Sequence, residues 1–262
     1  MRIALLGDIH ANLPALEAVL GDIDARSDVD TVLHVGDLVG YGPWPNETIA
    51  VIWERRILGV AGNYDSTVAT DHEHCGCRYE NPHQEELSHR SYEWTLSQVW
   101  AETKRFLASL PFRLDLRPFG GHASGPQLIV VHGAPTRNTL YLDADRQDDF
   151  LATMARKAAA REGDLLAFGH THIPWRREVE GVHLLNVGSV GKPKDGDWRA
   201  AYALLEFPDE GSPHSKIIRV EYDLDRTTAT IRESGLPGEF AELLRTGGHL
   251  DETPVAGDKP NK

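Results

Sequence analysis

The feature that most constrains the fold is a repeated pattern in which a short apolar run ends at a glycine beside a metal-capable side chain. The pattern occurs as Gly7-Asp8-Ile9-His10, Gly36-Asp37, Gly62-Asn63, His132-Gly133 and Gly169-His170-Thr171-His172. Glycine lacks a β-carbon, so the backbone can turn sharply there and neighbouring segments can approach closely. Each apolar run therefore predicts a buried strand that delivers a polar side chain at one end.

The first predicted strands span 2–7, 31–35 and 57–60. Between them, apolar residues recur at helical spacing. Asn12 is suited to cap the first helix, and a second helix is expected over 49–56. Strand–helix–strand units of this length predict parallel pairing with right-handed crossovers. Further along, we expect helices at 96–110 and 148–161, strands at 127–131 and 165–168, hairpin-like strands at 176–180, 182–187, 201–206 and 216–222, and a helix after Asp225.

An alternating half followed by a mostly antiparallel half predicts the α/β class, with two sheets packed face to face and helices outside. We expect a single domain over 1–246, because the glycine-centred motifs are spread along the chain and must converge. Residues 66–94 are polar and rich in His, Cys and Glu, so they predict an insertion near the site. Residues 247–262 predict a disordered tail.

Charge and composition limit the class of partner. The formal net charge of −13 argues against non-specific binding to the nucleic-acid backbone. Bound metals would still allow a small phosphorylated ligand to bind. No apolar run approaches the roughly 20 residues of a membrane span, so no membrane association is expected. Cys75 and Cys77 lie one residue apart and are poor candidates for a disulfide, which favours a reduced, cytoplasmic setting.

The motifs together supply more donors than one tetrahedral zinc site can use. In an extended segment residues i and i+2 share a face, so Asp8 pairs with His10 and His170 pairs with His172. Ligands bind at the carboxyl ends of strands in such sheets, which places all the donors on one rim. We therefore predict two divalent metal ions, with manganese first and Fe, Zn, Ni or Co as alternatives. The predicted metal ligands are Asp8, His10, Asp37, Asn63, His132, His170 and His172.

In this order the motifs resemble those of the calcineurin-like metallophosphoesterase superfamily, over about residues 1–191. The closest likeness is to its small bacterial and archaeal phosphodiesterase-like branch, where a segment like 186–191 follows the last ligands. The resemblance implies a four-layer α/β/β/α sandwich of two mixed β-sheets flanked by helices. It also implies that a hydroxide held by both metals attacks phosphorus. The implied ligand sets are Asp8, His10 and His172 for one metal, Asn63, His132 and His170 for the other, and Asp37 between them.

Tyr64 stands where many members of the superfamily have a histidine that assists the leaving group. A phenol with a pKa of about 10 can donate a hydrogen bond but is a poorer proton donor than an imidazolium. The exchange favours diesters with good leaving groups or 2′,3′-cyclic nucleotides. We therefore predict a binuclear phosphodiesterase, with a phosphomonoesterase acting on nucleotides or phosphoproteins as the alternative. A tyrosine that only packs beside the site stays equally open.

Other residues near the motifs are candidates for supporting roles. Asp65 is a candidate to orient a histidine ligand, or else to form a turn. In the first case it would act in catalysis with Asp37, Asn63 and Tyr64. By resemblance the segment 186–191 borders the site, so substrate-binding candidates are Asn186, Ser189, Lys192 and Arg199, although each of the two cations alone would more often be solvated at the surface.

The remaining histidines and cysteines are weaker candidates. His72, His74, Cys75 and Cys77 place four donors in six residues, but their spacing does not match a zinc framework. We therefore favour an insertion that covers the active site over a third metal site. His34 is expected in the core. No role is assigned to His83, His89, His122, His183, His214 and His249.

Two other classes of protein compete with an enzyme acting on a small phosphorylated substrate. An inactive scaffold of the same fold is disfavoured, because none of the seven expected ligands is missing. A nuclease is disfavoured by the acidic charge and the lack of a basic stripe. Trp94 and Trp100 fit either a subunit interface in a homo-oligomer or core packing.

Overall fold

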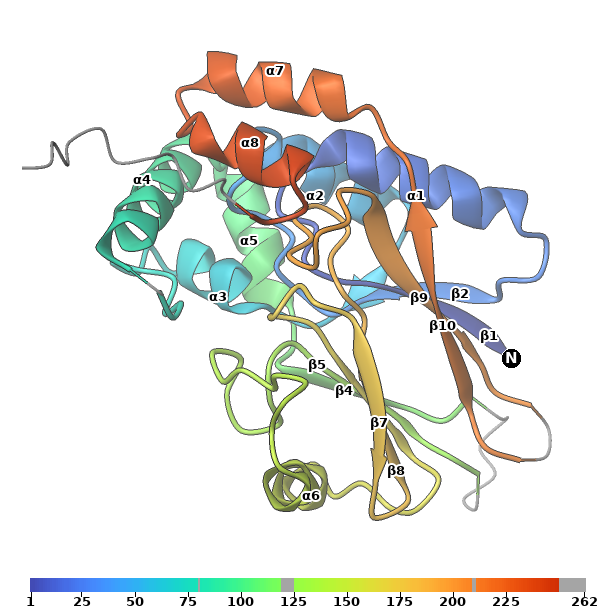
Figure 1. Ribbon diagram of the computed structural model, residues 1–262. Coiled ribbons are helices and arrows are strands. Elements are labelled where there is room, and N and C mark those ends of the chain that lie inside the picture. The colour runs from blue at the N-terminus through green and yellow to red at the C-terminus, as the bar shows by residue number, and fades with distance from the viewer. Residues whose placement is uncertain (80, 119–124, 209–210, 250–262) are drawn as a thin grey trace, which may run out of the picture.

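The computed structural model describes residues 1–79, 81–118, 125–208 and 211–249, which contain two five-stranded sheets (Figure 1). Sheet A has the order β10-β9-β1-β2-β3 and sheet B the order β4-β5-β6-β8-β7. The strands of sheet A are β1 (Arg2–Leu6), β2 (Thr31–His34), β3 (Leu58–Gly59), β9 (Ala200–Glu206) and β10 (His214–Val220). Those of sheet B are β4 (Arg113–Leu116), β5 (Leu128–Val131), β6 (Leu165–Phe168), β7 (Trp175–Val179) and β8 (Val182–Asn186).

Both sheets are mixed. In sheet A, β1 runs parallel to β2 and antiparallel to β9. In sheet B, β6 runs parallel to both β5 and β8, while β4 and β7 form antiparallel edges. The parallel strands β1, β2 and β3 therefore end on one edge of sheet A, and β5, β6 and β8 end on one edge of sheet B.

Helices cover the outer faces of the two sheets. Figure 1 shows α1, α2 and α7 over sheet A and α6 beneath sheet B. The described helices are α1 (Leu13–Ala25), α2 (Pro45–Glu54), α3 (Asn63–Ala69), α4 (Pro82–Gln98), α5 (Ala101–Ser109), α6 (Asp148–Lys157), α7 (Leu224–Ser234) and α8 (Glu239–Arg245). The order helix, sheet, sheet, helix confirms the predicted four-layer sandwich.

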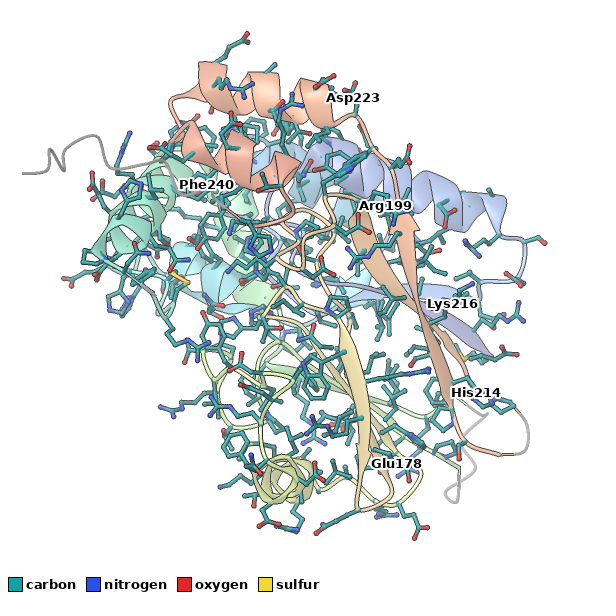
Figure 2. The ribbon with its side chains drawn as sticks, in the orientation of Figure 1. Glu178, Arg199, His214, Lys216, Asp223 and Phe240 are labelled. Carbon is teal, nitrogen blue, oxygen red and sulfur yellow. A yellow bond between two sulfur atoms is a disulfide. The ribbon has the colours of Figure 1, made fainter. Side chains whose placement is uncertain are left out.

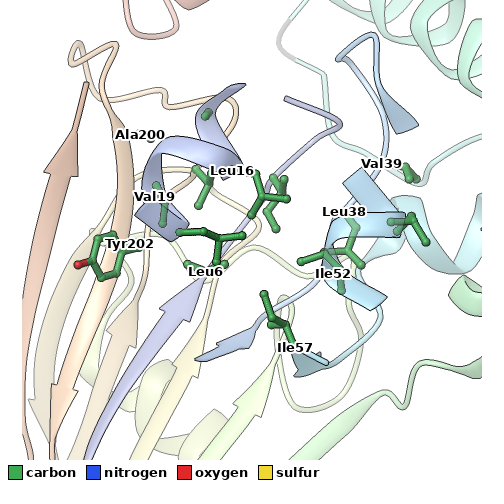
Figure 3. Packing of buried hydrophobic residues seen from close by; sticks show 14 of the residues in the cluster. Leu6, Leu16, Val19, Leu38, Val39, Ile52, Ile57, Ala200 and Tyr202 are labelled. Carbon is green, nitrogen blue, oxygen red and sulfur yellow. The ribbon is translucent and has the colours of Figure 1, made fainter. Parts of the chain in front are cut away.

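Alternation along β1 explains how one strand serves two cores. Ile3 and Leu5 face the space between the sheets, where they join side chains of β5 and β6 such as Val130. Ala4 and Leu6 face α1 and α2 instead, in the cluster that Figure 3 shows around Leu6, Leu16, Val19 and Ile52. Successive strand residues point to opposite faces, so a strand buried on both faces reads as one continuous apolar run.

The predicted helix over 96–110 is interrupted at 99–100, because two helices meet inside it. The chain is extended at Val99 and Trp100 between α4 and α5. Asn46 stabilises this break: its amide nitrogen donates to the carbonyl of Gln98, and its oxygen accepts from the backbone N–H of Trp100 and the hydroxyl of Thr103. A tertiary contact from α2 thus supplies the cap that the local sequence lacks. The short β4 and α8 were not predicted.

The predicted insertion, 66–94, contains the end of α3, a loop and most of α4. Within the loop, Cys75 and Cys77 form a disulfide, so the expectation of a reduced pair is wrong. Gly76 lies between them with a positive φ of 73°, which turns the chain and brings the two α-carbons to 5.5 Å. Cysteine usage therefore no longer argues for a reducing compartment.

Two further expectations concern the ends and faces of the chain. Gly247 and Gly248 hydrogen-bond to Gly196 and Leu243, whereas the rest of the predicted tail, 250–262, lies outside the described residues, as does His122. Trp94 packs against α7 and α8 and donates its indole N–H to the carbonyl of Ser234.

No helix in the described part of the chain has both the length and the apolar character needed to cross a membrane.

Candidate metal centre

All five glycine-centred motifs converge where strands of the two sheets end. They form two groups of possible metal ligands, and within each group the ligating atoms lie within 4.8 Å of one another. We call Asp8, His10 and His172 the first cluster, and Asp37, His132 and His170 the second cluster. Asn63 joins the second cluster, since its Oδ1 lies 3.0 Å from Nε2 of His132. The sequence prediction brought together these same seven residues.

Backbone carbonyls fix the orientation of three of the histidines. The Nδ1 atoms of His10, His132 and His172 lie 3.0, 2.9 and 2.6 Å from the carbonyl oxygens of Val39, Val35 and Lys192. A carbonyl only accepts, so each Nδ1 carries the proton and donates it. In the neutral ring Nε2 then keeps a lone pair, and this lone pair points into the centre.

The first cluster is suited to a cation because its two rings cannot satisfy each other. Nε2 of His10 and Nε2 of His172 face each other at 3.1 Å. Burial lowers the pKa of His10 to about 3 and that of His172 well below its usual value, so both rings are neutral. With both protons at Nδ1, two lone pairs meet in a buried place, which is unfavourable unless a positive charge lies between them.

The second cluster has the same character with one difference. Nε2 of His132 lies 3.1 Å from Nδ1 of His170, whose own Nε2 is buried with no hydrogen-bond partner among the described residues. Burial opposes the charged form of His132, but Asp37 and Asp8 raise its pKa to about 9. In the protein alone, a proton on Nε2 of His132 therefore balances the charge of the carboxylates. A bound cation would balance that charge from the same place.

Asp37 is the carboxylate that reaches both clusters. Its Oδ2 lies 3.8 Å from Nε2 of His10 and 3.4 Å from Nε2 of His132. Burial alone would raise its pKa, but the charge and hydrogen bond of His132, together with the other histidines, lower it to about 2. Burial instead raises the pKa of Asp8 to about 7. Divalent cations fit this donor set, since they would hold both carboxylates in their charged form.

Five of the candidate ligands have a backbone conformation that is unusual for residues with a side chain. Their φ angles are positive, a region that favours glycine. The residues are Asp8 (49°), His10 (47°), Asp37 (52°), His170 (68°) and His172 (62°). Such strain costs roughly 1–3 kcal/mol per residue and tends to gather at functional sites.

The loops that carry Asp37 and Asn63 pack glycine against glycine. A β-carbon on Gly36, which has a φ of +96°, would lie 2.4 Å from the backbone nitrogen of Gly62. A β-carbon on Gly62 would lie 2.0 Å from Oδ1 of Asp37. The approach that brings both ligands to the second cluster therefore requires these two glycines.

Asp65 supports the site differently from the prediction. It does not hydrogen-bond a histidine; its two oxygens accept from the backbone N–H groups of Leu38 (2.8 Å) and Gly62 (2.9 Å). It therefore joins the loop of Asp37 to the loop of Asn63 at the first turn of α3. A capping carboxylate satisfies N–H groups that the helix leaves unpaired.

Three of the predicted substrate-binding residues are occupied elsewhere. Asn186 is fully buried, donates to Gly169 and Thr171, and accepts from Gly188. Ser189 is also fully buried and donates to the carbonyl of Asp8. Both side chains brace the ligand loops instead of facing a ligand, because the close packing of the two strand ends leaves them no free donor.

Arg199 lies outside the site, at the start of β9, where Figure 2 labels it. Its guanidinium pairs with Asp197 at 2.7 Å. Proximity in sequence to the segment 186–191 was therefore a poor guide to its position.

The two clusters open into a cavity of about 410 Å³. Two tyrosines in its wall pack against ligand rings: Tyr41 edge-on against His10, with centroids 4.9 Å apart, and Tyr141 at a tilt against His170, at 3.9 Å. Neither was predicted, because an isolated tyrosine carries no metal-binding signal. Other wall residues that sequence reasoning missed are Arg78, Tyr79, Asn81, His83, Gln84, Lys194, Phe240 and His249.

Lys192 does reach this cavity, as predicted. Its ammonium lies 4.3 Å from the ring centroid of Tyr41 and 5.9 Å from that of Phe240, which Figure 2 shows on α8. Burial lowers its pKa well below the usual value of a lysine.

Tyr64 also borders the cavity and is fully buried. Its ring packs edge-on against His10, with centroids 5.5 Å apart, and against Tyr41 at 4.9 Å. Its hydroxyl has no hydrogen-bond partner among the described residues. Packing beside the site is therefore observed, while donation to a leaving group stays a prediction.

The Cys75–Cys77 loop contacts a candidate ligand. Nδ2 of Asn63 donates to the carbonyl of Cys75 (2.9 Å) and lies 3.4 Å from the sulfur of Cys77. These contacts identify the nitrogen of the amide and so aim its oxygen at His132. Among the described residues, His72, His74 and the cysteines form no metal-binding group. His34 is buried as predicted, and both its ring nitrogens are unpartnered within that same part of the chain.

A sandwich of two mixed sheets with a convergent Asp, Asn and His rim defines a class of hydrolases. Residues 1–210 match the calcineurin-like phosphoesterase superfamily domain, so the chain belongs to this family and the predicted resemblance is confirmed. The family is metal-dependent, and the two clusters are its candidate metal sites here.

Three relatives illustrate the position of the chain within the family. The uncharacterized protein MJ0912 of Methanocaldococcus jannaschii is 32% identical over 262 residues, covering 94% of this chain and 98% of that protein. A metallophosphoesterase from Sphaerobacter thermophilus has a crystal structure that is 31% identical, with a TM-score of 0.73, covering 94% and 100%. Phosphodiesterase YfcE of Escherichia coli is 24% identical over 216 residues, covering 79% and 88%.

Proposed function

We propose that the protein hydrolyses phosphodiesters of small molecules with two divalent cations, manganese first among them, bound in the first and second clusters. The observation that carries the proposal is the pair of neutral imidazoles in the first cluster, His10 and His172, whose lone pairs face each other beside a carboxylate shared with the second cluster. A cytoplasmic location stays a prediction.

Two divalent cations held by the first and second clusters would supply positive charge that stabilises the phosphate and activates water. The chain contributes fixed geometry. The backbone N–H of Tyr64 donates to Oδ1 of Asp37, which leaves Oδ2 toward both clusters. The backbone N–H of His170 donates to Asp8. Ligands held in this way need little reorganisation during the reaction.

The preference for diesters rests on Tyr64. The position after Asn63 offers no imidazole, and a neutral phenol is a weak acid for an alkoxide leaving group. The name of the related phosphodiesterase YfcE agrees with this choice. A phosphomonoesterase is the alternative that the substrate test must separate.

The first test compares a bis-aryl phosphate diester with the matching aryl monoester, with added Mn²⁺ and then with a chelator. We expect faster cleavage of the diester and loss of activity when the metal is removed. Faster monoester cleavage would reverse the preference. No metal-dependent cleavage of either ester would favour a scaffold over an enzyme. Metal content per chain, measured by mass spectrometry, should approach two.

A further inference from the structure

Lys192 has an ammonium group that the structure leaves without a polar partner. The residue is only 9% exposed, and its ammonium makes no hydrogen bond to another described residue. The aromatic faces of Tyr41 and Phe240 are its neighbours. The amine reaches the cavity, and its largely buried surroundings disfavour a bare positive charge, so the position favours an anionic group that arrives with a ligand and keeps the amine protonated.

The charge of the cavity wall supports the same conclusion. The chain as a whole has 40 acidic and 27 basic residues besides histidine. Among the described wall residues, however, Asp37 is the only carboxylate, while Arg78, Lys192 and Lys194 bring three basic side chains. Two bound divalent ions would make the cavity more positive still. A wall of this sign in an acidic protein attracts more negative charge than one phosphodiester carries.

Lys192 lies on the side of the cavity that adjoins the first cluster. Its backbone carbonyl accepts from Nδ1 of His172, and the ring of Tyr41 lies close to both its amine and His10. Arg78 lies over Tyr141, whose ring packs on His170, but its side chain is 58% exposed and is within 3.5 Å of Asp143. Of these two basic side chains, Lys192 therefore has the more buried position.

We propose that Lys192 binds a second phosphate group of the substrate, next to the phosphate that the two clusters would hold. The inference rests on the proposed function and adds to it: the natural substrates are phosphate esters that carry a further phosphate, not simple singly charged diesters. Tyr41 and Phe240 would keep the ammonium in place and exclude water from this contact.

Equilibrium binding tests the proposal without turnover. The probes are thymidine 5′-monophosphate, thymidine 5′-diphosphate and thymidine 3′,5′-bisphosphate, measured by calorimetry with and without Mn²⁺. We expect wild type to bind at least one doubly phosphorylated probe roughly tenfold or more tightly than the monophosphate, as expected for a charge-assisted contact. Lys192→Met should remove that gain, and Lys192→Arg should keep part of it. Lys157→Met, on the exposed face of α6, is the matched control.

A kinetic pair extends the test to the reaction. The p-nitrophenyl diester of thymidine 5′-monophosphate is compared with the same compound bearing a 3′-phosphate. We expect the Lys192→Met variant to lower kcat/KM for the phosphorylated compound, relative to kcat/KM for the plain diester, by roughly tenfold, with the loss mainly in KM. Thermal unfolding checks that the variant is folded.

The possible failures are distinguishable. Equal binding of all three probes by wild type, or a gain that persists in a folded Lys192→Met variant, would overturn the assignment even if diesters are cleaved. A gain that depends on Lys192 with no metal-dependent cleavage would keep the second phosphate site and overturn the proposed hydrolysis.

Discussion

Two regions of the cavity wall are built in opposite ways. The ligand rim comprises the strand-end loops that carry the seven candidate ligands, none of which is more than 4% exposed. The pocket cover comprises residues 77–79, 81–88 and α8. In the rim, backbone groups of neighbouring loops hold most of the ligand side chains. In the cover, side chains such as Asn81 and His83 are exposed and face the cavity.

The rim and the cover therefore determine different properties of the protein. A rim in which every ligand is buried and oriented tolerates little change and defines the type of chemistry. The cover lies on a loop and two helices and carries exposed side chains beside buried ones such as Leu87 and Phe240. Its exposed positions can vary without disturbing the sheets, so they are suited to define the substrate.

The largest expected effect comes from breaking the rim at its shared carboxylate. Asp37→Asn should reduce kcat/KM by roughly a thousandfold or more and empty at least one metal site, because the amide lacks the charge that both clusters share. Turnover and metal content are the measurements, with the exposed Asp145→Asn as control. Full activity in a variant that binds less metal would contradict the assignment of two metals.

The next largest effect is on stability. It tests whether the hydrogen bonds of Asp65 hold the loops of the rim together. Asp65→Ala leaves the buried N–H groups of Leu38 and Gly62 unpaired, which should lower the free energy of unfolding by about 2–5 kcal/mol. Chemical denaturation measures it. Glu73→Ala, in the exposed loop, should stay within about 0.5 kcal/mol of wild type. Equal stability of both variants would mean that other contacts hold these loops.

Tyr64 lies where rim and cover meet, so its substitution sharpens the boundary between them. Tyr64→His should raise monoester relative to diester cleavage by about tenfold or more if the position adjoins the leaving group. Tyr64→Phe distinguishes the role of the hydroxyl: a fall in kcat would indicate hydrogen-bond donation, and no change would indicate packing alone. An unchanged ratio in a folded Tyr64→His variant would place the leaving group elsewhere.

The smallest effect is expected from the cover. Replacing both Cys75 and Cys77 by Ser should leave two metals per chain, since neither sulfur belongs to a cluster and the carbonyl of Cys75 still accepts from Asn63. A change of a few-fold in KM is the most that loosening of the loop should cause. Loss of one metal equivalent would show that the loop belongs functionally to the rim.

The rim was predictable because its signal is local. A strand that ends in glycine beside Asp, Asn or His carries both the turn and the ligand in consecutive letters, and the alternation of Asp8 with His10 already gives the shared face. The same holds for α1, whose cap Asn12 accepts from the backbone of Ala15.

The cover was not predictable because tertiary contacts create it. Phe240 becomes a wall residue only when distant segments meet, as do Tyr41 and Tyr141 elsewhere in the cavity wall, and α8 starts after Gly238, which offers no capping side chain. For the same reason Asn186 and Ser189 were misassigned: their partners are backbone groups of other strand ends. The break at Trp100 likewise depends on Asn46, more than fifty residues earlier.

The left-handed backbone of Asp8, His10, Asp37, His170 and His172 has a consequence for the history of the chain. Glycine would relieve the strain at each position, so a duplicate released from catalysis would gain stability by accepting it. Selection for thermal robustness and selection for turnover therefore act in opposite directions on these five codons. Side chains at all five positions are what selection for the proposed turnover would keep, and laboratory evolution for heat resistance alone should erode these positions early.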